Sequence, residues 1–381
     1  MVTGAMLVEE ISLYQTPCFI YNADELERKI KSAKSWSLKH NLHLLYAMKA
    51  NSFCDVLEIF SPHVNGLSVS SPFEALWGKN FLTSDQVIHY SSPLLDFSQA
   101  LKDLPLLTSA NSLNQWNLFG GGIRLKFPGP FKNQNENEFQ SAYDPGRKDS
   151  HLGVPIEEFT KYISHKVNQA NLPQGLSWHS FCELKDFSEF LSLSEVLTKN
   201  LGPYLQLFQW LNLGGGFLLE EGINQEDFKK GLDLIRQYFT GPIYFEPGYD
   251  LVEGAFCLKT QIKDKIDNKL ILDTSINHLP EVMQFKDKLV LKEEDPEGEQ
   301  RFQLLGCSCL ISDSFGEYNF HQTPLIGDEL TFLYVGAYSM VKANRFNGIN
   351  LPSIYRYSEN EGYVLRKKYF FEDYCQQFSI K

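Results

Sequence analysis

Four positions that could do chemistry each follow directly on a short apolar run. They are Lys49 in "LLYAMKANS", His179 in "LSWHSF", Gly214, Gly215 and Gly216 in "WLNLGGG", and Glu246 in "FEPG". Taken singly, the glycines could form only a tight turn, and the histidine could be a core residue. The glutamate is harder to explain in that way, because a buried carboxylate is costly without a cationic or hydrogen-bonding partner.

Together these residue types are what pyridoxal phosphate (PLP) requires. A lysine amine forms the Schiff base that holds PLP, and converging glycine amides bind a phosphate. An imidazole can stack on the pyridine ring, and a carboxylate at the ring nitrogen keeps it protonated and strengthens the electron sink. The set therefore predicts a PLP site with Lys49 as its catalytic amine.

A parallel barrel would bring these positions to one place. From residue 20 to 250, apolar runs alternate with helical patterns, which is typical of a (β/α)8 TIM-type barrel. Eight runs are predicted as strands: 42–47, 65–69, 86–90, 105–109, 121–127, 176–181, 208–213 and 242–246. Barrel active sites lie at the carboxyl ends of the strands. The four positions follow the first, sixth, seventh and eighth strands, so we expect them at one rim.

The character of the chain changes near residue 250. Runs such as "FCLKTQIKDKI" and "ELTFLYVG" are rich in β-forming residues, with no long helical pattern between them. This predicts an antiparallel β-domain over residues 251–381, joined by residues 1–19. The segment 128–151 is polar and rich in Asn, Gly and Pro, and we expect it to be a mobile lid or disordered.

Composition excludes several classes of function. The 381 residues carry a net charge of -12, which argues against nucleic acid or an anionic membrane as the main partner. The sequence has neither an apolar run of membrane-spanning length nor a signal peptide. Seven scattered cysteines indicate reduced thiols and a cytoplasmic location. Cys307 and Cys309 form a C-x-C without companion Cys or His residues, so we expect no metal site.

The chain resembles carboxynorspermidine decarboxylase over nearly its whole length. The motifs that carry the resemblance are "YAMKAN", "NGLSVSSPFEAL", "IHYSSPLL", "WHSFCE", "WLNLGGG", "FEPG", "LILDTSINHLPEV", "GCSCLISDSFGEY" and "GAYSMVKANRFNGINLPSI". That enzyme belongs to the fold type III group of PLP enzymes, with alanine racemase and ornithine and diaminopimelate decarboxylases. The resemblance implies a PLP-binding barrel, a C-terminal β-domain and α-decarboxylation, and it assigns His179 to the ring and Glu246 to the ring nitrogen.

The resemblance also implies roles in the β-domain. Cys309 matches the cysteine that protonates the carbanion after carbon dioxide leaves, and Tyr338 matches the tyrosine that hydrogen-bonds the phosphate. Asp313 matches an acid near the distal amine of the substrate. In this group Cys309 and Asp313 enter the active site of the other subunit, so the resemblance implies a homodimer with shared sites.

Three departures from the family pattern concern the substrate tail. Tyr249 in "EPGY" replaces a substrate-contacting glutamate, Glu281 in "HLPE" replaces an aspartate, and His151 in "SHLG" replaces an arginine. One candidate substrate is a polyamine precursor, carboxynorspermidine or carboxyspermidine. The other is N-citrylornithine, a precursor of a rhizoferrin-type siderophore, which the change to tyrosine favours. An anionic tail needs cationic partners, for which the candidates in loops are Lys126, Lys132, Arg147 and Arg345.

Two other functions share this barrel. Racemases of the group place an arginine at the ring nitrogen, and Glu246 argues against that. A non-catalytic regulator of the antizyme-inhibitor type would be expected to lose Lys49, the glycine loop or Cys309, and all of them are present. Decarboxylation is therefore the leading prediction.

Overall fold

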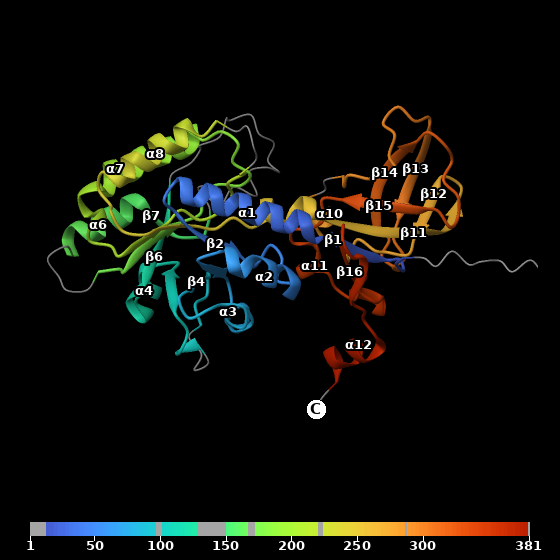
Figure 1. Cartoon of the computed structure of the whole chain (residues 1–381), viewed down its shortest axis with the longest axis horizontal. Coiled ribbons are helices and arrows are strands. Elements are labelled where there is room, and N and C mark those ends of the chain that lie inside the picture. The colour runs from blue at the N-terminus through green and yellow to red at the C-terminus, as the bar shows by residue number, and fades with distance from the viewer. Residues whose placement is uncertain are drawn as a thin grey trace, which may run out of the picture. The chain divides into compact units, whose positions relative to one another are not determined.

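The structure, a computed structural model, describes residues 13–96, 101–127, 150–166, 172–219, 224–285 and 288–379. Contacts between residues divide the chain into two compact units. One is Leu26–Val252, and the other combines Met1–Glu25 with Glu253–Lys381. Figure 1 shows helices around strands in the first unit and a set of strands in the second.

Eight parallel strands close into a barrel in the first unit. They are β2 (His43–Ala47), β3 (Gly66–Val69), β4 (Val87–Ser91), β5 (Leu106–Ala110), β6 (Gly122–Lys126), β8 (Gly175–Trp178), β9 (Trp210–Asn212) and β10 (Ile243–Phe245). Their order is β5-β4-β3-β2-β10-β9-β8-β6, and pairing of β5 with β6 closes the ring. A short strand, β7 (Val154–Pro155), pairs with β6. Each predicted strand overlaps an observed one, and the predicted barrel fold is confirmed.

Helices follow most of the strands. In this part of the chain they are α1 (Ala23–Lys39), α2 (Cys54–Phe60), η1 (Ser61–His63), α3 (Pro72–Lys79), α4 (Leu113–Phe119), α6 (Ile156–Lys166), α7 (Ser188–Leu205), α8 (Glu226–Arg236) and α9 (Tyr249–Val252). Helix α7 buries Phe190, Leu193 and Leu197, whose spacing places them on one helical face. Helices α7 and α8 pack side by side (Figure 1). None of the helices in the described ranges combines the length and apolar character that a membrane span needs.

The second unit is built on a sheet of eight strands. They are β1 (Cys18–Asn22), β11 (Phe256–Ile266), β12 (Lys269–Leu272), β13 (Gln300–Leu305), β14 (Ser314–Phe320), β15 (Glu329–Leu333), β16 (Ser353–Ser358) and β17 (Gly362–Lys367). Their order is β14-β13-β12-β11-β1-β16-β17, and β15 also pairs with β11. The helices of this unit are η3 (Glu253–Ala255), α10 (Glu281–Phe285), α11 (Ser339–Lys342), η4 (Phe346–Gly348) and α12 (Phe371–Phe378).

The expectation of an antiparallel domain was wrong for two pairings of this sheet. Strand β1 runs parallel to β16, and β12 runs parallel to β13. Antiparallel pairs can be joined by tight hairpins, whereas parallel pairs need long connections. Both parallel pairs have them, because β1 comes from the opposite end of the chain and residues 273–299 separate β12 from β13.

Candidate active site

The four predicted positions lie at one rim of the barrel. Lys49, His179, the glycine loop 214–216 and Glu246 follow the carboxyl ends of β2, β8, β9 and β10. These four strands are consecutive neighbours in the ring, in the order β2-β10-β9-β8. The structure therefore brings together all of the site residues that were predicted from the barrel sequence.

Glu246 is held as an anion by two donors. Its Oε1 accepts a hydrogen bond from Nδ2 of Asn212 at 2.7 Å and is also in hydrogen-bond contact with Nδ1 of His89. Burial alone would raise the pKa of this carboxyl. The contact with His89, the hydrogen bond from Asn212 and the nearby His179 outweigh burial and lower the pKa of Glu246 to about 2. The carboxylate is thus ionised at neutral pH.

The ring of His179 is fixed and neutral. The N–H of Gly215 donates to Nδ1 of His179 at 2.9 Å, so this nitrogen is an acceptor. Desolvation by burial, with the positive charges of Lys49 and Arg124, holds the pKa of His179 well below its usual range. A neutral imidazole with a fixed plane is suited to lie against a flat ring.

The loop after β9 has room only for glycine. Gly214 and Gly216 have φ of +74° and +87°, in the region that side chains disfavour. A Cβ at Gly214 would collide with the carbonyl oxygen of Trp178, one at Gly215 with that of Glu246, and one at Gly216 with that of Phe181. The glycines therefore let the loop pack directly on the segments that follow β8 and β10.

The amides of this loop do not all remain for a phosphate. The N–H of Gly214 donates to Oδ1 of Asn212 at 2.9 Å, and the N–H of Gly215 is used by His179. The N–H of Gly216 makes no hydrogen bond within the described residues. The N–H of Gly216 is thus available to a phosphate, and the predicted role of the three glycines stays a prediction.

The amine of Lys49 is less basic than an ordinary lysine. The side chain is exposed by surface area, yet the protein atoms around it desolvate the amine and lower its pKa. Glu246 opposes this shift, and the guanidinium of Arg124 adds to it. A lysine with a lowered pKa is a better nucleophile at neutral pH, because more of it is unprotonated.

Three polar residues of this site were missed in the sequence. They are His89 in "VIHYS", Arg124 in "GIRLK" and Asn212 in "WLN", which lie on β4, β6 and β9. The sequence did carry a signal, because each is a polar residue within a predicted strand of a closed barrel. A role for these residues could be inferred only by knowing which strands lie together.

These residues fit PLP. Nε of Arg124 and Oγ of Ser177 are buried and have no hydrogen-bond partner among the described residues. The two residues are paired in the register of β6 and β8. Buried polar groups are usually satisfied, so these two atoms indicate a bound polar group. A low-pKa lysine amine, an anionic glutamate and an unused glycine amide complete a donor set for an aldehyde, a ring nitrogen and a phosphate.

Asp313 lies in the other unit and is almost fully buried. Its side chain is 3% exposed. It accepts hydrogen bonds at 2.9 Å from Oγ of Ser275 and from the backbone N–H groups of Ile276 and Ser308, and a further one from Oγ of Ser308. Oδ2 accepts three of these hydrogen bonds and Oδ1 accepts one. Asp313 thus anchors the loop before it, and its implied role near a substrate amine stays a prediction.

Cys309 lies in that anchored loop. Its side chain is exposed, and its N–H donates to Oδ1 of Asn347 at 2.9 Å. Ile311, two residues further on, is fully exposed. The loop between Gly306 and Asp313 thus presents its tip to the outside of the β unit while its base is buried.

Glu281 and Tyr338 lie close to one lysine in the β unit. Nζ of Lys342 forms an ion pair with Glu281, donates to Oε1 of Gln284 at 2.9 Å, and lies 4.8 Å from the ring centroid of Tyr338. Burial raises the pKa of Glu281, and Lys342 opposes this rise. Glu281 is thus paired with a lysine of its own unit, and its predicted contact with substrate stays a prediction.

The remaining predicted contacts to a substrate tail are only partly described. Tyr249 begins α9, three residues after Glu246. Nζ of Lys126 donates to the carbonyl oxygen of Ser150 at 2.7 Å, and Arg345 lies over the ring of Tyr369 at 5.3 Å. Lys132, Arg147 and the predicted lid, apart from Ser150 and His151, lie outside the described residues.

Two further features bear on the location of the site. Within the described ranges, no group of three or more His, Cys, Asp or Glu side chains could hold a metal ion.

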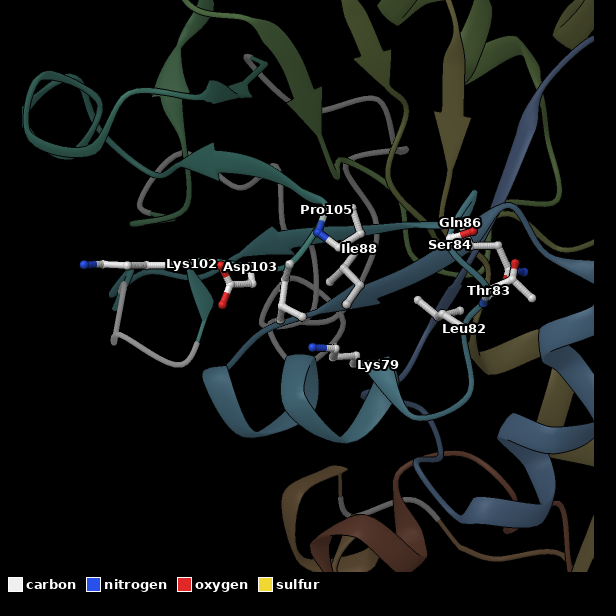
Figure 2. A pocket seen from close by; sticks show the side chains of 10 residues that line it. Lys79, Leu82, Thr83, Ser84, Gln86, Ile88, Lys102, Asp103 and Pro105 are labelled. Carbon is white, nitrogen blue, oxygen red and sulfur yellow. Dashed lines mark hydrogen bonds between the residues drawn. The ribbon is translucent and has the colours of Figure 1, made fainter.

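A pocket of about 550 Å³ is lined by residues that include Lys79, Gln86 and Pro105 (Figure 2). Gln86 and Pro105 directly precede β4 and β5, so this pocket is at the amino-terminal rim, opposite the rim that carries Lys49.

Known proteins similar to this chain are decarboxylases, although no protein-family model matches it. A carboxynorspermidine/carboxyspermidine decarboxylase of Herminiimonas arsenicoxydans is 26% identical over 380 residues, covering 96% of this chain and 100% of that protein. A carboxyaminopropylagmatine decarboxylase of Synechocystis sp. is 24% identical over 382 residues, covering 96% of this chain and 95% of that protein. This chain also matches the solved structure of carboxynorspermidine decarboxylase from Campylobacter jejuni complexed with norspermidine. The TM-score is 0.79 at 23% identity, and the match covers 96% of this chain and 100% of that chain.

In its fold and its rim residues the chain is similar to PLP-dependent decarboxylases of the fold type III group, the class to which these relatives belong. Within that group the chain is similar to carboxynorspermidine decarboxylases over nearly its whole length, which confirms the predicted resemblance.

Proposed function

We propose that this chain removes the α-carboxyl group of an N-substituted diamino acid, forming an amine and carbon dioxide. The observation that carries the proposal is the ionised Glu246 among the rim residues. A carboxylate at the ring nitrogen favours decarboxylation over racemisation, because it keeps that nitrogen protonated.

Each rim residue has a separate task. PLP, when bound, supplies a sink for the electron pair that the departing carboxylate leaves behind. The amine of Lys49 would hold the aldehyde carbon of the cofactor. Glu246 holds the proton of the ring nitrogen, His179 supports the ring face, and the N–H of Gly216 binds the phosphate. Tyr338 is a further phosphate ligand in this proposal.

Cys309 returns the proton to the α-carbon. Its exposed position at the tip of an anchored loop supports entry of this loop into the active site of a second copy. We therefore expect a homodimer in which each barrel is completed by the β unit of its partner. No disulfide is formed among the described cysteines, which supports a cytoplasmic enzyme.

The substrate tail is the finer part of the proposal. We propose N-citrylornithine, with a role in siderophore biosynthesis, because Tyr249 replaces the glutamate that would attract a cationic tail and repel a citryl group. The ion pair of Glu281 with Lys342 is consistent with this, since it removes a second negative charge that could attract a polyamine. The alternative is a polyamine precursor, and the names of the relatives favour it.

A direct competition tests the substrate. The purified enzyme with PLP is incubated with N-citrylornithine, carboxynorspermidine and carboxyaminopropylagmatine, and carbon dioxide and product mass are followed. We expect the citryl compound to have the highest kcat/KM. The Tyr249→Glu variant should lose activity on it and gain about tenfold to a hundredfold on the two polyamine precursors, because a carboxylate contributes about 1.5–3 kcal/mol to binding a cationic tail. Turnover of the polyamine precursors alone would reject the siderophore role and retain the decarboxylase.

A further inference from the structure

A chain of hydrogen bonds crosses the barrel interior from Ser109 to Glu246. His89 is 2% exposed; its Nδ1 contacts Oε1 of Glu246, and its Nε2 lies 2.7 Å from Oγ of Ser109. The order Ser, His, Glu is that of a hydrolase triad. Ser109, however, is 0% exposed, so no substrate reaches its hydroxyl and the three residues cannot act as a nucleophilic triad.

The contact between His89 and Glu246 spans the ring. His89 is on β4, which is separated from β10 by β3 and β2. Asn212, on the neighbouring β9, donates to the same Oε1 of Glu246. Nδ2 of Asn212 also lies 3.1 Å from Nδ1 of His89, so both nitrogens meet at Oε1 of Glu246.

The two oxygens of Glu246 differ in their surroundings. Both donors reach Oε1, whereas no hydrogen bond to Oε2 exists within the described residues. The side chain as a whole is 14% exposed. One oxygen is thus fixed inside the barrel, and the other remains for a group at the rim.

We propose that His89 is a positioning residue, which sets the rotation and the negative charge of Glu246 so that Oε2 meets the ring nitrogen of the cofactor. This inference rests on the proposed function. Ser109 fixes the orientation of His89 through Nε2, and the ring of Trp210, 5.6 Å away at 75°, packs edge-on against it. An imidazole can bond to both sides at once, which a residue with one polar atom cannot.

Two substitutions of His89 test the roles of its Nδ1 and Nε2 separately. The amide nitrogen of Asn occupies the position of Nδ1 of histidine, whereas that of Gln occupies the position of Nε2. His89→Asn keeps a donor to Glu246 but loses the contact with Ser109. His89→Gln keeps a group that contacts Ser109 but loses the donor to Glu246. We expect His89→Asn to bind PLP and turn over substrate within about threefold of the native chain. His89→Gln should lose roughly tenfold to a hundredfold in PLP affinity and in kcat, with KM nearly unchanged.

A cofactor-free measurement separates this inference from the proposed function. In the ¹⁵N-histidine-labelled chain without PLP, the Nδ1 proton of His89 should give a strongly downfield resonance that moves upfield in Glu246→Gln. If the resonance is present but PLP does not bind, the proposed function is wrong, and the role toward the cofactor fails with it. If the resonance is absent from the native chain, the inference itself is overturned.

The pair of variants also decides the inference. Native PLP affinity and kcat in His89→Gln would overturn it, as would a His89→Asn variant as defective as His89→Gln. Thermal unfolding of both variants checks that they fold. Should His89→Gln fail to fold, native-like PLP affinity of His89→Asn supports the inference, and a hundredfold loss in that variant overturns it.

Discussion

Replacing Asp313 should destabilise the β unit rather than weaken substrate binding. Its carboxylate accepts two backbone N–H groups, from Ile276 and Ser308, which cannot turn elsewhere, and two serine hydroxyls, which can. Each buried N–H left without an acceptor costs about 1–3 kcal/mol. Asp313→Ala leaves both backbone N–H groups without an acceptor. We therefore expect a loss of about 2–6 kcal/mol in the free energy of unfolding.

Asp313→Asn should cause only part of this loss in the free energy of unfolding. Ile276 donates to Oδ1 and Ser308 to Oδ2, so an amide loses one of the two backbone bonds whichever way it is turned. The expected loss is therefore about 1–3 kcal/mol. Asp264→Ala is the matched control, since Asp264 is exposed in the same unit, and a surface change of this kind costs about 0.5 kcal/mol or less.

Urea unfolding of the β unit and hydrogen exchange at the amides of Ile276 and Ser308 measure these effects. Both amides should lose protection in the order native, Asn variant, Ala variant, while KM changes little in any variant that remains folded. The anchor reasoning is refuted if Asp313→Asn keeps native stability and amide protection but raises KM tenfold. That result would restore Asp313 as a substrate ligand.

Three further predictions concern the barrel rim and assembly. Lys49→Ala should abolish turnover, and borohydride treatment of the native holoenzyme followed by peptide mapping should place the cofactor on Lys49 and on no other lysine. Mixing inactive Lys49→Ala with inactive Cys309→Ala should restore activity, because a mixed dimer holds one site with both native residues; exchange of subunits without activity would reject shared sites. Glu246, whose pKa is lowered from 4.5 to about 2, should contribute about 3 kcal/mol of stability above pH 4.5. This stability is lost as the pH falls toward 2, and roughly half of it by pH 3, so urea unfolding should show a smaller difference between native chain and Glu246→Gln at pH 3 than at pH 6.

The barrel and its rim were predictable because their signals are local. Each strand is a short apolar run between amphipathic helices, and the alternation alone defines a parallel barrel. Parallel closure then forces every strand's carboxyl end to one rim, so Lys49, His179, the glycine loop and Glu246 could be placed together without knowing any distance. Residue types alone then indicated the cofactor.

Only the tertiary structure decided how the rim residues are held. His89 and Glu246 are 157 positions apart, and β4, which carries His89, is not a neighbour of β10, which Glu246 follows, so no spacing in the sequence relates them. The same holds for Asp313, whose donors include Ser275 and Ile276 nearly 40 positions away, so nothing in the sequence indicated that it anchors a loop. Sequence patterns report which face a residue prefers, whereas hydrogen bonds across the interior depend on which elements meet, and that is settled only when the chain closes.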